Sequence, residues 1–124
     1  MGAWGSEIWD NDEAADWFGD FFKGIKANAR IRNAFKDRND IPVIRAACFI
    51  LGSLGHVYVW PGDLDELKQL LEEGIELLSR IAKPTDEDLE DNDFLEYWDD
   101  DPKLIKSVKA QIAELRKRRD EFQG

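Results

Sequence analysis

Five carboxylates crowd the stretch DNDEAADWFGD near the start of the chain: Asp10, Asp12, Glu13, Asp16 and Asp20. Side chains four residues apart on a helix face the same way, so Asp12, Asp16 and Asp20 would form one acidic face. Such a face could bind a divalent cation or supply a paired acid and base. The alternative is a solvated helix face, which we favour because most metal and hydrolytic sites also use histidine.

Side chains suited to nucleophilic or general-base chemistry are scarce, because the chain has one histidine and one cysteine. Cys48 lies in AACFILG, among residues that are usually buried, so we expect a core thiol rather than a nucleophile. His56 follows Gly55 at the end of an apolar stretch, where it is expected to cap a helix. No phosphate-binding loop, dinucleotide fingerprint or Cys/His metal spacing occurs, so no cofactor is expected.

Two tryptophans, Trp4 and Trp9, precede the acidic stretch. With nearby carboxylates such as Asp10, their indoles could form a patch that binds a cationic ligand. The alternative is structural, with residues 1–10 forming an N-terminal arm. Gly2 and Gly5 would let its backbone lie close to the helices, and both indoles would be buried against the core. We favour the structural interpretation.

The opening MGAWG, followed by WDNDEAADWF, resembles the start of a family of small bacterial proteins, the domain of unknown function 4259. That start is M-G-x-W-G, a spacer with an aromatic residue, then N-D-x-A-x-D and another aromatic. The matching positions are Met1, Gly2, Trp4, Gly5, Trp9, Asn11, Asp12, Ala14, Asp16 and Trp17. The later pieces RAACFILG and FLEYW also resemble family segments. The resemblance implies a helical fold and no particular reaction.

The segment from Asp86 to Asp101 contains ten acids among its sixteen residues and no base. The rest of the chain has 27 − 10 = 17 acids against 17 bases, so this segment carries the entire net charge of −10. The segment could be a docking surface for a basic protein, with acids that steer the encounter and aromatic side chains that anchor it. Its candidate binding residues are Phe94, Tyr97, Trp98, Asp99, Asp100 and Asp101. The alternative, which we slightly favour, is a solvated loop whose aromatic side chains pack on the core, with Lys103, Lys106 and Lys109 partly neutralising it.

Helices must position these residues, because apolar side chains recur at spacings of three and four and no segment alternates long enough for a strand. We expect a first helix from Asn11 or Asp12, a break at residues 24–28, and a short second helix. Asp40 is expected to begin a helix that is apolar nearly all round, and Asp63 a long amphipathic one ending before Pro84. A last helix is expected from Pro102. The fold class is therefore all-α, a compact single domain over residues 1–124 with about five or six helices, an arm at 1–10 and an acidic segment at 85–101.

The net charge and the pI of about 4.5 disfavour nucleic acids and anionic membranes as partners and favour a basic protein. We find no secretory signal and no membrane span in the sequence, and together with the lone cysteine this predicts a cytoplasmic protein. Our leading hypothesis is a protein–protein interaction module, as in an immunity-type inhibitor of a basic toxin. The alternatives are a divalent-cation-dependent enzyme that uses the N-terminal carboxylates and a small-molecule-binding domain. The oligomeric state stays open.

Overall fold

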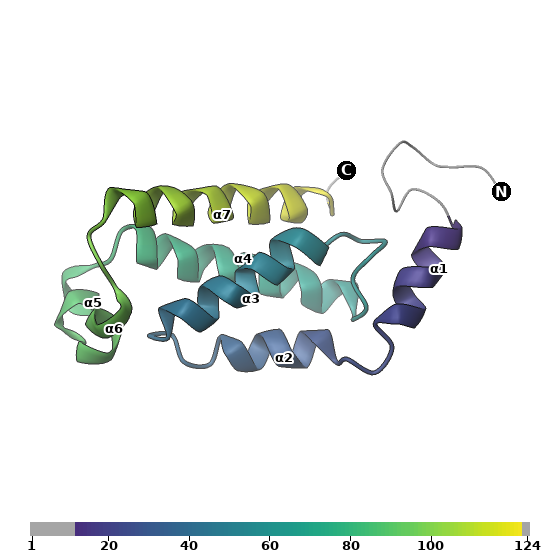
Figure 1. Cartoon of the computed structure of the whole chain (residues 1–124), viewed down its shortest axis with the longest axis horizontal. Helices are drawn as coiled ribbons and strands as arrows, with labels where there is room; N and C mark the ends of the chain where they lie inside the picture. Colours follow the sequence, from purple (N-terminus) through teal and green to yellow (C-terminus); the bar gives the residue numbers. More distant parts are fainter. Residues whose placement is uncertain (1–11, 123–124) are drawn as a thin grey trace.

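The computed structural model describes residues 12–122 and shows an all-α fold, without strands in that range (Figure 1). Seven helices follow one another within it. They are α1 (Asp12–Phe21), α2 (Ala27–Ala34), α3 (Ile41–Leu54), α4 (Leu64–Ala82), α5 (Asp86–Glu90), α6 (Asn92–Tyr97) and α7 (Pro102–Asp120). The count exceeds the expected five or six because the acidic segment contains two short helices. The predicted arm, residues 1–10, lies outside the described residues.

The core is built by α3, α4 and α7, which pack on one another, with α2 against α3 and α4. Helix α4 begins as expected, with the Asp63 carboxylate accepting a hydrogen bond from the backbone N–H of Glu66 at 2.9 Å. Its apolar face is buried along the whole helix: Leu67, Leu70, Leu71, Ile75, Leu77, Leu78 and Ile81. Gly74 lies on this face, where a Cβ would be 2.9 Å from Leu115 Cδ1. The glycine therefore lets α4 approach α7 closely.

The expected break between the first two helices is confirmed. Gly24 has φ +86°, in the left-handed region that glycine adopts without strain, and Lys26 at the start of α2 has φ 56°. The chain thus changes direction between α1 and α2. Asn28 of α2 then accepts a hydrogen bond from the Trp60 indole at 2.6 Å and donates one to the backbone carbonyl of Asp63 at 3.1 Å. These two bonds join α2 to the loop between α3 and α4.

Helix α3 is central, as expected, and contacts α2, α4, α6 and α7. Although α3 is apolar nearly all round, its neighbours do not cover every side of it. Val43, Phe49 and Ile50 are exposed, with 67% of the Phe49 surface accessible. The four neighbouring helices cover one side of α3 and leave this apolar stripe uncovered within the described part of the chain. Among the described helices, none is long and apolar enough to cross a membrane.

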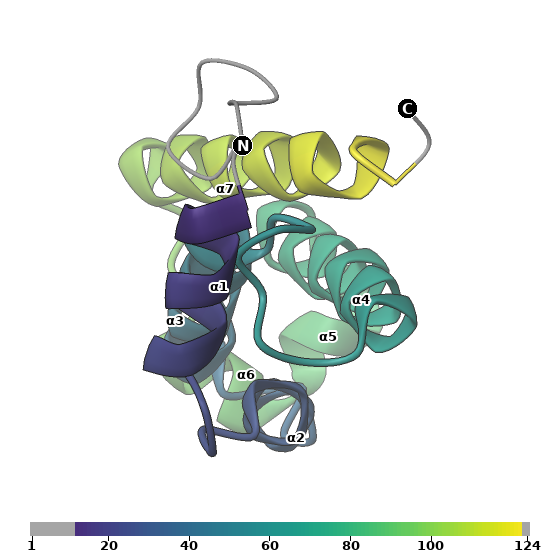
Figure 2. The ribbon, with the colours of Figure 1, turned by 90° about the vertical axis from the view of Figure 1, so that its right-hand side faces the viewer.

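Helix α1 stands at the end of the bundle, and its backbone does not approach that of another described helix (Figures 1 and 2). The spacing of Phe18, Phe21 and Phe22 gives α1 an apolar face. Phe18 and Phe22 are half-buried, whereas Phe21 is 62% exposed and the neighbouring Trp17 59%. The two exposed rings stack on each other, with their centroids 5.1 Å apart. The apolar face of α1 is therefore only partly buried.

Candidate functional site

The acidic segment is an ordered part of the fold, because three of its carboxylates begin helices. Asp88 and Thr85 form a reciprocal capping box at the start of α5, with Thr85 N–H donating to Asp88 at 2.9 Å and Asp88 N–H donating to Thr85 at 3.2 Å. Asp91 accepts hydrogen bonds from the first N–H groups of α6, and Asp101 from Lys103 N–H at the start of α7. These acids are needed for local structure. Asp101 thus caps α7, and its expected contact with a partner stays a prediction.

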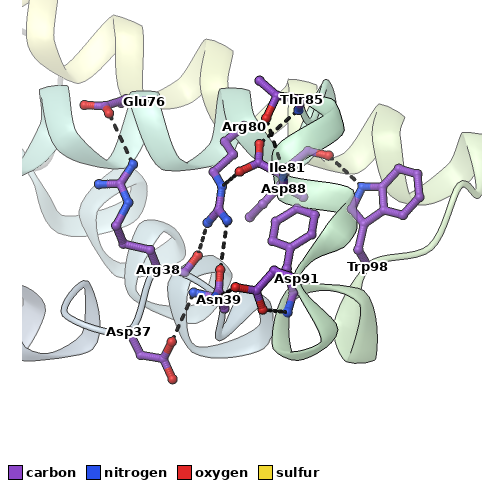
Figure 3. A network of polar contacts seen from close by, with 11 residues as sticks. Asp37, Arg38, Asn39, Glu76, Arg80, Ile81, Thr85, Asp88, Asp91 and Trp98 are labelled. Atoms are coloured by element: carbon purple, nitrogen blue, oxygen red, sulfur yellow. Dashed lines mark hydrogen bonds and ion pairs between the residues drawn. The ribbon is translucent and has the colours of Figure 1, made fainter.

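One cation, Arg80 near the end of α4, holds this segment against the bundle (Figure 3). Its Nε is 2.7 Å from Asp88 Oδ1 and its Nη2 is 2.8 Å from Asn39 Oδ1, while Nη1 donates to the backbone carbonyl of Arg38. Asn39 in turn donates to Asp91 at 3.2 Å. Arg80 and Asp88 are only 17% and 16% exposed, so water screens their ion pair weakly. A single guanidinium thus joins α4, α5, α6 and the α2–α3 loop.

The electrostatics of Asp88 reflect these contacts. Burial by itself raises the pKa of this carboxyl, but hydrogen bonds from Thr85 and Arg80 and the charge of Arg80 outweigh it and hold the pKa below its usual value. The predicted neutralisation by Lys103, Lys106 and Lys109 is not what the structure shows. Among the described residues, none of the ion pairs uses these lysines, and Arg80 supplies the one to the acidic segment.

Two of the expected anchors face the core, which corrects their assignment. Phe94 is fully buried, and the Arg80 guanidinium carbon lies 4.4 Å from its ring centroid. Trp98 is half-buried, and its indole N–H donates to the backbone carbonyl of Ile81 at 3.0 Å (Figure 3). Phe94 is unavailable to a partner, and Trp98 chiefly attaches the end of α6 to the end of α4. For these two side chains, the alternative of aromatic packing on the core is the correct one.

Tyr97 and Leu95 are the exposed large side chains of α6, at 45% and 41%. Carboxylates surround Tyr97, and they raise the pKa of its hydroxyl. Glu96 acts most strongly, followed by Asp40, with reduced hydration, Asp37 and Asp93 adding to the effect. Asp37 and Asp40 precede α3, so two segments far apart in the sequence contribute negative charge around one tyrosine.

We call this surface the acidic end. It consists of Leu95 and Tyr97 together with the exposed carboxylates Asp37, Asp86, Glu87, Glu90, Asp93, Glu96, Asp99 and Asp100 and the half-buried Asp40. It lies around α5 and α6 and the α2–α3 loop, at the opposite end of the molecule from α1 (Figure 1). Its shape is set by Arg80 and the caps, and its exposed surface combines negative charge with two apolar side chains.

The N-terminal candidates that the structure describes, Asp12 and Asp16, do not join this surface. Asp12 begins α1 and Asp16 lies exposed on it, at the other end of the bundle, while Trp4, Trp9 and Asp10 lie outside the described residues. The described members of the two sets therefore lie at opposite ends of the bundle. In the range 12–122, no group of three or more His, Cys, Asp or Glu side chains is placed to hold a metal ion.

The lone histidine and cysteine lie elsewhere. His56 is buried where the end of α3 meets the end of α7, with Nδ1 3.1 Å from Glu121 Oε1 and both ring nitrogens 2.6 Å from Arg118 Nη1. Burial, followed by the Arg118 charge, lowers the pKa of His56 despite the opposing effect of Glu121. Cys48 is buried against Gly74, and burial raises the pKa of its thiol to about 12. Such a thiol is a poor nucleophile.

Two modest hollows on the described surface are candidates for a small-molecule site. A depression of about 340 Å³ lies between α4 and α7, with Lys109 and Arg116 beside Ala82 and Ile112. A second, of about 270 Å³, lies between α3 and α7 next to Phe49. Both are at or below the lower end of the range for ligand sites, and neither contains a set of converging polar groups beyond exposed side chains.

Sequence reasoning did not assign Arg80, Asp37 or Asp40 to the acidic surface, although it identified Asp40 as a helix cap. The only available signal for Arg80 was its place among the apolar residues near the end of α4, four residues before Pro84. Comparison of the chain with family models, with curated proteins and with solved structures finds no match in any of the three. The resemblance of the opening motif to the domain of unknown function 4259 therefore stays a prediction.

Proposed function

We propose that this protein binds another protein through its acidic end, which docks on a basic surface. The observation that carries the proposal is Tyr97, an exposed aromatic side chain surrounded by carboxylates from α6 and from the α2–α3 loop. Aromatic side chains are frequent anchors in interfaces, and surrounding charges of one sign select an oppositely charged partner and speed the encounter. An immunity-type inhibitor of a basic toxin is a function of this kind.

The rigidity of the surface supports the proposal. Two short helices would not be stable alone, yet Arg80, the Asp91 cap and the Trp98 indole fix them to the bundle. A preorganised surface loses less conformational entropy when it binds. The exposed carboxylates of α6 make no ion pair within the described chain, so no described cation occupies the place of a basic partner.

A cytoplasmic location and the relation to the domain of unknown function 4259 belong to the same proposal. A lone buried thiol suits a reducing compartment, and the opening motif supports the family relation. The partner we propose is a protein rather than a nucleic acid or a membrane, because the acidic end repels phosphate groups.

Matched charge variants test the proposal. The acidic-end variant is Asp93→Asn, Glu96→Gln and Asp99→Asn, three exposed residues whose carboxylates accept none of the hydrogen bonds described above. The control is Glu13→Gln, Asp16→Asn and Asp20→Asn, which makes the same change in net charge on α1 at the opposite end. Both should fold, because all six side chains are exposed.

Each protein is used to capture partners from a cytosolic extract of the native host, and association is then measured with the purified partner. We expect one basic protein at a 1:1 ratio. Its association rate should fall on the order of tenfold with the acidic-end variant and stay unchanged with the α1 control. The proposal is wrong if both triple variants associate at the wild-type rate, or if the α1 control alone loses the partner.

A further inference from the structure

Helix α3 has an uncharged exposed side. Its sequence, IPVIRAACFILGSL, contains no acid and one base, although 35% of the chain's residues are charged. That base, Arg45, is half-buried and donates hydrogen bonds to Gln111 and Ser107 of α7. The exposed residues of α3 recur at spacings of three and four, and we call them the α3 face: Pro42, Val43, Ala46, Phe49, Ile50 and Ser53. A continuous apolar face of this kind is typical of an interaction surface.

The α3 face lies on the outside of the bundle. Figure 1 shows α3 in front of α4, between α7 and α2, and Figure 2 shows α3 and α4 on opposite sides of the bundle. Ile44, Cys48 and Leu51 fill the inner side of α3, whereas Phe49 on the outer side is 67% exposed. Helix α3 has 14 residues, so the face is about 21 Å long.

The shape of the α3 face is complementary to itself. Phe49 is large and exposed, whereas Ala46, three residues earlier, is small. Beside Phe49 lies the hollow of about 270 Å³ between α3 and α7, which Gly52 and Ser53 help to line. A two-fold axis midway between Ala46 and Phe49 would place each Phe49 on Ala46 of a second copy, and each Val43 at the hollow of that copy. Large side chains would then face small ones or a hollow, as in a packed interface.

The distribution of charge favours an antiparallel arrangement of two such helices. The acidic end lies at the start of α3, because Asp40 caps this helix and α6 contacts it. Lys23 and Lys26 are exposed near the other end of α3, in the turn whose residue Ile25 lines a groove together with Leu54. Residues 86–101 carry the entire net charge of −10, so a parallel pair would place two acidic segments side by side. An antiparallel pair separates them and brings each closer to the lysines of the other copy.

We propose that the α3 face is the interface of a symmetric dimer, in which α3 packs antiparallel on α3 of a second copy of this chain. An uncharged face does not select a charged partner, whereas it matches its own relief. A two-fold interface needs only one self-complementary surface, which the α3 face provides. The dimer has an acidic end at each extremity, so the interface does not compete with the docking of a basic protein.

Sedimentation of the full chain at increasing concentration tests the dimer. Self-association should appear between about 1 and 100 µM, as expected for a small two-fold interface. Phe49→Glu should weaken it by at least about 100-fold, because the variant places a charge at the centre of the contact. The matched control is Phe21→Glu, the same change at a side chain that is 62% exposed on α1, and it should associate like the wild type. Far-UV circular dichroism checks that both variants fold.

A short bis-maleimide cross-linker tests the orientation. In the antiparallel pair Val43 faces Ser53 of the second copy, whereas the two copies of Val43 are about 13 Å apart along the helix axis. The double variant Val43→Cys with Ser53→Cys should therefore link into dimers far more efficiently than either single variant. The wild type measures the background from Cys48, whose buried thiol reacts slowly because its pKa is raised to about 12.

The dimer is refuted if the wild type stays monomeric at about 500 µM, well above the dissociation constant expected for it. It is also refuted if Phe49→Glu associates like the wild type, or if Phe21→Glu dissociates as well. A monomeric wild type that captures another protein through Phe49 would show that the occupant is a different partner. Efficient linking of the single variants would refute the antiparallel arrangement, since each cysteine faces its own counterpart in a parallel pair. Absence of linking in the double variant would refute the antiparallel arrangement too.

Discussion

Replacing Arg80 by methionine should detach the acidic end from the bundle while keeping most of the aliphatic packing of the side chain. The substitution removes the ion pair to Asp88, the hydrogen bonds to Asn39 and to the Arg38 carbonyl, and the contact of the cation with the Phe94 ring. It also leaves Asp88, only 16% exposed, without its cation. The effect is therefore expected at α5 and α6, ahead of the rest of the fold.

The size of the stability loss in Arg80→Met depends on how far Arg80 and Asp88 are buried. Hydrogen bonds to charged groups contribute about 1.5–3 kcal/mol each, and breaking a fully buried pair costs about 3–5 kcal/mol. The contributions of one side chain are not additive, and Arg80 and Asp88 keep some contact with water. We therefore expect a loss of about 3 kcal/mol, which is about 1.5 M in the urea midpoint for a domain of this size.

The matched control is Arg38→Met. Arg38 also forms an ion pair, with Glu76 at 3.3 Å, but the two side chains are 50% and 69% exposed. Such a pair contributes at most about 1 kcal/mol. Urea unfolding measures both variants, and hydrogen exchange should show faster exchange at residues 86–97 in Arg80→Met alone. If the two variants lose equal stability, or if exchange at residues 86–97 is unchanged, Arg80 does not hold the acidic end.

The same variant has a defined pH dependence. Because the pKa of Asp88 is lower in the folded than in the unfolded state, its carboxylate stabilises the fold fully at pH values above its unfolded pKa of about 3.8. That stabilisation is lost as the pH falls through the pKa of Asp88 in the folded state. The difference in stability between wild type and Arg80→Met should therefore narrow below about pH 4.

Three further predictions follow from the core and from α6. Trp98→Ala should lower the free energy of unfolding by about 2–4 kcal/mol, because the indole is half-buried and donates a hydrogen bond to the Ile81 carbonyl. Thermal unfolding measures the loss, and an unchanged Tm would make Trp98 a candidate binding anchor again. The Cys48 thiol, with its pKa raised to about 12, should react with an aromatic disulfide reagent at pH 8 at least about 100-fold more slowly in the folded than in the unfolded protein. Gly74→Ala should lower the free energy of unfolding by about 1 kcal/mol, because the steric cost of a Cβ 2.9 Å from Leu115 Cδ1 outweighs the gain in helix propensity. A stabilised variant would show that Leu115 moves aside without cost.

Helix starts and stops were predictable because they depend on neighbouring residues. Asp63 caps α4, Asp40 caps α3, and Gly24 marks the break, as the local sequence indicates. The side of each helix that is buried was less predictable. The spacing of Phe18, Phe21 and Phe22 predicts an apolar face, but whether a partner covers that face depends on tertiary arrangement, which periodicity does not encode.

The acidic segment shows the same limit. Its charge and its aromatic residues were evident, but spacing alone did not separate Phe94 and Trp98, which face the core, from Tyr97, which faces solvent. Two helices of five and six residues are too short for a clear periodic pattern. Asp37 and Asp40 come beside Tyr97 only through the fold, since they lie more than fifty residues earlier in the chain.

The distribution of cations around the acidic end favours binding over stability as the reason for its charge. Closely spaced carboxylates repel one another, and a segment selected for stability alone would place bases among them. Here Arg80 forms an ion pair with the half-buried Asp88, and Asp91 and Asp101 accept hydrogen bonds from backbone N–H groups at helix starts. The exposed carboxylates, from Asp86 to Asp100, form no ion pair with the described chain, although Lys103 and Lys106 follow closely in sequence.

If the repulsion among these carboxylates is uncompensated in the free protein, neutralising Asp93, Glu96 and Asp99 should not lower the free energy of unfolding. We expect it to stay equal or to rise by up to about 1 kcal/mol. Urea unfolding of the triple variant tests this prediction. A loss of stability would mean that these acids serve the fold and not a partner.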